Sequence, residues 1–217
     1  IVGLETGDTL ELGSLSGAVS VVAVTLGSGA WELLVNPTGT AAAYAQFGGV
    51  SANGGNAALS LPDCYWAFDF FYQAKPASGS EPLFEARTLS PAALKLAVRL
   101  DSAGKLSVYD QAGVSQGLGA TVLSVNTAYR IEVRVGTGTA AAYGLRINGV
   151  GELSGTCDQT ASNLEAIRIG KPTNIGGNTV SYRFDNLVGD DAAYPGTGIS
   201  LRRDVTGAGA SSGWTGG

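Results

Sequence analysis

The feature that most constrains this chain is the stretch CYWAFDFFYQA at residues 64–74. In an extended backbone alternate side chains face opposite sides, so Trp66 and Phe68 share one side while Phe71 lies on the other. A strand with aromatic bulk on both faces needs cover on both, and edge strands are usually shorter or interrupted by charge. The stretch therefore predicts a central strand of a β-sandwich.

Composition and spacing favour many short strands in one domain. The 217-residue chain has 33 glycines and 14% charged residues, and its apolar runs end at Gly, Asn, Ser or Asp, which favour tight turns. The segment at 88–100 has the best helix propensity, but from Leu94 onwards apolar residues alternate with polar or small ones, which predicts a strand. Clear hairpins are expected at 94–113 and 128–150. We expect an all-β fold, a two-sheet antiparallel β-sandwich.

The absence of histidine excludes several chemistries. A chain with no His cannot form a Ser-His-Asp triad, a His-based acid/base site or a His zinc site. Two cysteines, Cys64 and Cys157, are too few for a thiolate zinc site. One disulfide and two separate thiols both remain open, because a bridge needs Cα atoms within about 7 Å of each other.

Charge and hydropathy exclude two classes of partner. The net charge is −5 and there is no run of Lys or Arg, so we expect no nucleic-acid partner. The longest apolar runs, such as 16–30, are interrupted by glycine and shorter than the roughly 20 residues that a membrane span needs, so no membrane insertion is expected. Residues 197–217 are rich in Gly and Ser and predict a tail or linker after a domain at 1–196.

A series of short motifs along the chain resembles the concanavalin A-like or laminin G-like jelly rolls of bacteriophage tail and virion surface proteins. The motifs are GLETGD at 3, WELLVNP at 31, YWAFDF at 65, GKLSVYD at 104, YRIEVRV at 129, LRINGV at 145, LEAIRIG at 164 and YRFDNLVGDDAAYPG at 182. The resemblance implies a non-enzymatic structural or adhesive domain of an extracellular assembly, such as a phage tail or capsid decoration protein. Its partners would be other virion or surface-assembly proteins, in a multimeric arrangement on the virion surface.

The same resemblance implies one metal site. Related carbohydrate-binding jelly rolls hold a structural calcium between a Glu near the first strand and an Asp in the last, which correspond here to Glu5 and Asp185. The alternative for Asp185 is a solvent-facing or backbone-bonded carboxylate. No other cofactor is expected.

An alternative function is carbohydrate binding, with a cell-surface glycan as the partner. Exposed aromatic and planar polar side chains on a concave face would carry it. The candidates are Tyr44, Tyr65, Asp69, Tyr72, Gln73 and Arg87. The competing interpretation is that these aromatics belong to the core, because one face of each sheet must be buried.

Glycan cleavage is a third, less favoured function. Retaining glycosidases need two carboxylates about 5 Å apart, and the pair to inspect is Asp69 with Glu85, on strands expected to be neighbours. The clustered Glu-x-Asp-x-Glu strand motif of laminarinase-like jelly rolls is absent. We therefore expect a protein that is not an enzyme.

Overall fold

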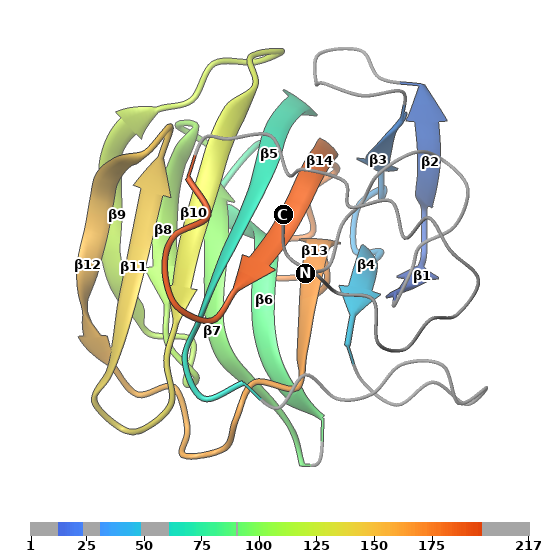
Figure 1. Cartoon of the computed structure of the whole chain (residues 1–217). Coiled ribbons are helices and arrows are strands. Elements are labelled where there is room, and N and C mark those ends of the chain that lie inside the picture. The colour runs from blue at the N-terminus through green and yellow to red at the C-terminus, as the bar shows by residue number, and fades with distance from the viewer. Residues whose placement is uncertain (1–12, 24–30, 49–60, 90, 197–217) are drawn as a thin grey trace, which may run out of the picture.

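The computed structural model describes residues 13–23, 31–48, 61–89 and 91–196 (Figure 1). This part of the chain forms two antiparallel sheets of seven strands each and contains no helix, so none that could cross a membrane. Sheet A has the order β1 (Gly13–Ser16), β4 (Ala43–Phe47), β13 (Ala166–Lys171), β6 (Ser80–Leu89), β7 (Ala92–Asp101), β8 (Lys105–Tyr109), β9 (Ser115–Val122). Sheet B has the order β12 (Val150–Cys157), β11 (Ala141–Ile147), β10 (Tyr129–Val135), β5 (Cys64–Ala74), β14 (Ser181–Asp190), β3 (Trp31–Val35), β2 (Val19–Ala23).

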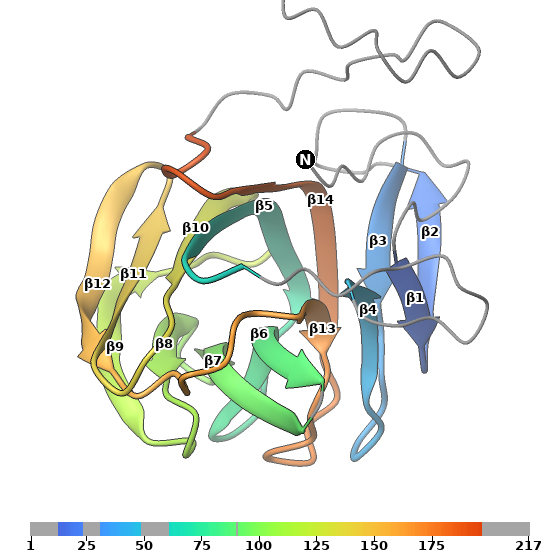
Figure 2. The same ribbon diagram turned by 60° about the horizontal axis from the view of Figure 1, so that its bottom comes forward.

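The two sheets pack face to face as a jelly-roll β-sandwich, which confirms the predicted fold class (Figure 2). The aromatic stretch is β5, and it lies in the middle of sheet B between β10 and β14. Its inward side chains meet those of sheet A, and the rings of Phe68 and Phe84 stack with their centroids 5.9 Å apart. The two predicted hairpins also form, as β7–β8 and β10–β11.

At one edge the two sheets are joined by a side chain. The carboxylate of Glu152 on β12 accepts hydrogen bonds from the backbone N–H and the hydroxyl of Thr121 on β9, at 2.7 and 2.8 Å. The first of these bonds pairs one backbone N–H on the open edge of β9. The outer faces of both sheets remain available for function.

The predicted metal site and tail are covered only in part. Glu5 and residues 197–217 lie outside the described residues. Asp185 is buried and accepts a hydrogen bond from the backbone N–H of Asn186 at 2.8 Å. Among the described residues there is no group of three or more His, Cys, Asp or Glu side chains that could hold a metal ion. The calcium site stays a prediction.

The two cysteines are separate thiols. Cys64 and Cys157 are both buried and both free, so the disulfide alternative is wrong. Cys64 lies at the start of β5 and Cys157 at the end of β12, which are separated in sheet B by β10 and β11. Three strand spacings of about 4.8 Å lie between the two strands, which exceeds the span of a disulfide.

Candidate functional site

The outer face of sheet A carries a line of side chains that runs across the strands. Because register partners on neighbouring strands point to the same side of a sheet, a chain of partners forms a row perpendicular to the strands. We call this the transverse row. Its members, from β4 to β9, are Gln46, Arg168, Glu85, Ala97, Tyr109 and Ser115. At about 4.8 Å per strand spacing it is roughly 24 Å long, which suits an extended chain rather than a single small molecule.

Three further side chains flank the row. Tyr44, Arg87 and Arg99 lie two residues from a member of the row on β4, β6 and β7, so strand alternation places them on the same outer face. We call the row and these three residues together the arginine face. The intervening residues, such as Phe84 and Val98, fill the core. The hydrophobic core therefore fixes which side chains this face presents.

Arginine side chains on this face are held against aromatic rings. The guanidinium of Arg168 lies 4.6 Å from the centroid of the Tyr44 ring, and its Nε donates a hydrogen bond to Oε1 of Gln46 at 2.8 Å. The guanidinium of Arg99 lies 3.7 Å from the centroid of the Tyr109 ring. Such cation–π contacts reduce the mobility of long side chains, which lowers the entropy lost when a ligand binds.

The pKa of Tyr109 is lowered. Burial acts to raise it, but hydrogen bonds with the hydroxyls of Ser80, Ser107 and Ser115 and the positive charge of Arg99 outweigh burial. These groups stabilise the phenolate form. Tyr109 is therefore the side chain on the arginine face whose environment would suit a proton acceptor.

The centre of the transverse row is occupied by a small apolar side chain and a paired carboxylate. Ala97 stands between Glu85 and Tyr109 and is 1% exposed. The carboxylate of Glu85 is engaged by Arg87, with Nη1 2.7 Å from Oε2. The face can bind a ligand through cations, rings and amides, but it presents no pair of carboxylates.

The outer face of sheet B is crossed by the segment that follows β14. Residues 191–196, which we call the strap, run over β10 and β11 (Figure 2). Gly196 donates its backbone N–H to Glu132 Oε1 at 2.9 Å and accepts a bond from Arg130 Nε at 3.2 Å. The ring of Tyr194 meets that of Tyr65 edge-on at 4.8 Å. The strap fills part of this face with the protein's own side chains.

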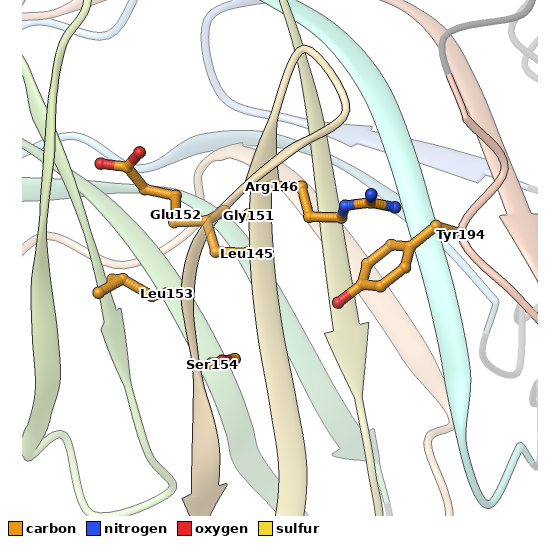
Figure 3. Close-up of a pocket in the computed structure, with 7 residues that line it drawn as sticks. All are labelled: Leu145, Arg146, Gly151, Glu152, Leu153, Ser154 and Tyr194. Carbon is orange, nitrogen blue, oxygen red and sulfur yellow. The ribbon is translucent and has the colours of Figure 1, made fainter.

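A shallow pocket of about 320 Å³ lies beside the strap. Figure 3 shows Arg146 and Tyr194 side by side, with the guanidinium 4.7 Å from the ring centroid, while Glu152 points the other way. Glu152 is already bonded to Thr121. Arg146, Tyr194 and Glu152 are thus engaged by contacts within the protein, and we favour the arginine face as the candidate site.

The six residues predicted to bind glycan do not share one face. Tyr44 and Arg87 belong to the arginine face. Tyr65, Asp69 and Gln73 lie on β5 and alternate with core residues, which places them on the outer face of sheet B. Tyr72, the sixth, is buried in the core, where its hydroxyl donates a hydrogen bond to the backbone carbonyl of Leu123 at 2.7 Å. The expectation of one shared face is wrong, because it ignored which sheet each strand joins.

The carboxylate pair predicted for cleavage is also wrong. Asp69 is on β5 of sheet B and Glu85 on β6 of sheet A, each on the outer side of its own sheet. Packed sheets are about 10 Å apart, so the core separates the two carboxylates. They cannot act on one glycosidic bond.

Four of the functional side chains on the arginine face were missed from sequence: Gln46, Arg99, Tyr109 and Arg168. Strand alternation could have found Gln46, Arg99 and Arg168, because each lies between two apolar residues in a predicted strand, whereas Tyr109 is followed by Asp110. What sequence could not supply was the order of strands, which sets them side by side with Arg87.

Comparison with known proteins shows the fold. No protein-family model matches the sequence and no curated protein matches it. The solved structure of a cellulose-induced protein, Cip1, is similar with a TM-score of 0.60 and 13% identity, over 86% of this chain and 88% of that one. An alginate lyase of Polysaccharide Lyase family 7, AlgAT5, has a TM-score of 0.53 and 12% identity, over 73% of this chain and 77% of that one. The Trypanosoma rangeli sialidase in complex with sialic acid has a TM-score of 0.53 and 16% identity. The similar region covers 74% of this chain but only 25% of the sialidase.

These similarities contradict the main functional expectation. The neighbours are jelly-roll proteins whose names refer to carbohydrates, not phage structural proteins. A virion tail or decoration role is therefore not supported, nor is a specific likeness to laminin G-like domains. At these identities the similarity shows the fold alone, and what is shown is a jelly-roll β-sandwich.

Proposed function

We propose that this protein is a glycan-binding domain that holds a polysaccharide along the transverse row without cleaving it. The observation that carries the proposal is the pair of arginines stacked on tyrosine rings, Arg168 on Tyr44 and Arg99 on Tyr109. Both pairs are on one face, and planar donors beside aromatic rings suit the hydroxyl groups and apolar faces of sugars. The printed names of the structural neighbours support the same class of ligand.

Binding without cleavage is favoured because the centre of the row is Ala97 and its one carboxylate is paired with Arg87. A domain of this kind gains from repetition, since several copies on one polysaccharide raise the overall affinity without new contacts. We also propose an extracellular location, where polysaccharides of this length are found.

Affinity electrophoresis through gels that contain a panel of neutral and acidic polysaccharides tests the proposal. At least one polysaccharide should retard the protein, and Tyr44→Ala should weaken the retardation about tenfold or more, since it removes a ring and the support of Arg168. Tyr194→Ala on the strap is the matched control and should leave retardation unchanged. Migration unaffected by every polysaccharide would overturn the proposal.

Glycan cleavage is a second candidate, favoured by the lowered pKa of Tyr109. In such a cleavage Tyr109 would take the proton from the sugar carbon next to a carboxylate, the electron pair left behind would form a C=C bond and expel the glycosidic oxygen, and that oxygen would take up a proton from water. Hydrolysis by paired carboxylates has no support in this geometry. If this candidate holds, a polysaccharide incubated with the protein shortens, and Tyr109→Phe stops the shortening but keeps binding. Unchanged chain length with the wild-type protein eliminates it.

A further inference from the structure

The arginines of the two outer faces differ in how their charge is balanced. On sheet B each described arginine lies beside a carboxylate. The pairs are Arg130 with Asp69 at 3.3 Å, Arg134 with Asp63 at 2.8 Å, Arg146 with Glu132 at 4.0 Å, and Arg183 with Glu32. Every described arginine of that sheet therefore has a carboxylate beside it.

On the arginine face of sheet A, only Arg87 among the three arginines forms an ion pair with a carboxylate of the described residues. Glu85 pairs with Arg87 at 2.7 Å, and among the described residues no carboxylate lies within 4.0 Å of the guanidinium nitrogens of Arg99 or Arg168. These two instead contact the rings of Tyr109 and Tyr44. The protein as a whole carries a net charge of −5. A face with an excess of positive charge on an acidic protein marks a surface for an anionic ligand.

The surroundings of Arg168 favour an added anion. Burial lowers its pKa, and the positive charge of Arg87 lowers it further, while Tyr44 and Glu85 act in the opposite direction. A carboxylate or sulfate placed beside Arg168 would offset both unfavourable effects. All three cations are arginines, whose planar donors bind carboxylate and sulfate oxygens in pairs.

We infer that the ligand of the arginine face is an acidic polysaccharide whose carboxylate or sulfate groups contact Arg99 and Arg168. This inference rests on the proposed function and adds the charge of the ligand. Arg168 is on β13 and Arg99 on β7, two strand spacings apart, or about 10 Å across the sheet. Acidic groups on separate units of one polymer chain reach the two guanidiniums together.

Affinity electrophoresis with three probes tests the inference: dextran, dextran sulfate and sodium polygalacturonate. We expect retardation by the acidic probes and little or none by dextran. Arg99→Gln and Arg168→Gln should each weaken binding of an acidic probe about tenfold or more, because each removes charge-assisted hydrogen bonds. Arg146→Gln, on sheet B, is the matched control and should bind as the wild type does.

Glu85→Gln is a second variant that does not depend on losing an arginine. It removes the only carboxylate of the arginine face, so affinity for the acidic probes should rise, and the rise should shrink as salt is added. If only dextran sulfate retards the protein, the recognised group is a sulfate. If only polygalacturonate retards it, the recognised group is a carboxylate. Either result supports the inference.

The contrary outcomes separate the inference from the proposed function. Binding of dextran as tight as that of the acidic probes overturns the inference and keeps glycan binding. Absence of binding to any polysaccharide overturns both. If Arg146→Gln binds the acidic probes as weakly as Arg168→Gln does, the binding site is not confined to the arginine face, and the inference is overturned. If a single-stranded nucleic acid binds more tightly than the acidic polysaccharides do, the ligand is of another class, and the inference is overturned as well.

Discussion

Arg99 lies with its guanidinium 3.7 Å from the centroid of the Tyr109 ring, on the face of sheet A that turns away from the core. The contact joins neighbouring strands, since Arg99 is on β7 and Tyr109 on β8. It positions a cation for an anionic ligand and also makes the phenol easier to ionise. Binding and acid–base behaviour on this face are thus linked through one pair.

Replacing Arg99 by Met should raise the pKa of Tyr109. The folded-state pKa of Tyr109 is lowered, so at alkaline pH the unfolded chain binds more protons and stability rises with pH up to the ordinary value of about 10. The gain is lost as pH falls through the folded-state pKa. The measurement is a pH titration that follows the ultraviolet absorbance of ionised tyrosine in the wild type and in Arg99→Met. The part of the titration curve that is lost in Tyr109→Phe belongs to Tyr109. Identical titration curves for wild type and Arg99→Met would contradict it.

Removing Lys171 should destabilise the fold strongly. Its Nζ lies 3.5 Å from Glu81 Oε1, and both side chains are fully buried. Lys171→Met leaves a buried carboxylate without its cation, which costs about 3–5 kcal/mol. Arg134→Met, which breaks a partly exposed pair with Asp63, should cost about 1 kcal/mol or less. Urea denaturation measures the free energy of unfolding of both variants. Equal losses of stability would contradict the claim that the buried pair of Lys171 and Glu81 matters more to the fold than the partly exposed pair.

The two thiols should be slow to react in the folded protein. Burial raises the pKa of Cys64 to about 12 and that of Cys157 to about 11, so the reactive thiolate is scarce at neutral pH. Alkylation followed by mass spectrometry should label both cysteines only after unfolding. A non-reduced peptide map that links Cys64 to Cys157 would show this account to be mistaken.

The strap should loosen when Gly144 is replaced by Ala. A Cβ on Gly144 would collide with the hydroxyl of Tyr194, whereas a Cβ on Gly151 would meet nothing within 4 Å. Limited proteolysis should therefore cut the strap faster in Gly144→Ala than in the Gly151→Ala control. Glycan binding should not change in either variant, because the arginine face is on the opposite sheet.

The sequence was sufficient to predict strands and the sandwich because the period of two is strong in segments such as 64–74 and 128–150. It was not sufficient to predict the site. Asp69 and Glu85 are only 16 positions apart, and yet β5 and β6 join different sheets. Arg168 and Glu85 are far apart in sequence but are register partners. Such long-range pairings depend on topology, which local patterns do not encode.

The most direct test of the central claim is to map the bound glycan by nuclear magnetic resonance. Amide shifts of ¹⁵N-labelled protein would be followed during titration with acidic oligosaccharides. We predict that the largest changes fall on β13, β6, β7 and β8, around Arg168 and Tyr109. Changes confined to β10, β11, β12 and the strap would contradict the claim that the arginine face of sheet A is the binding site.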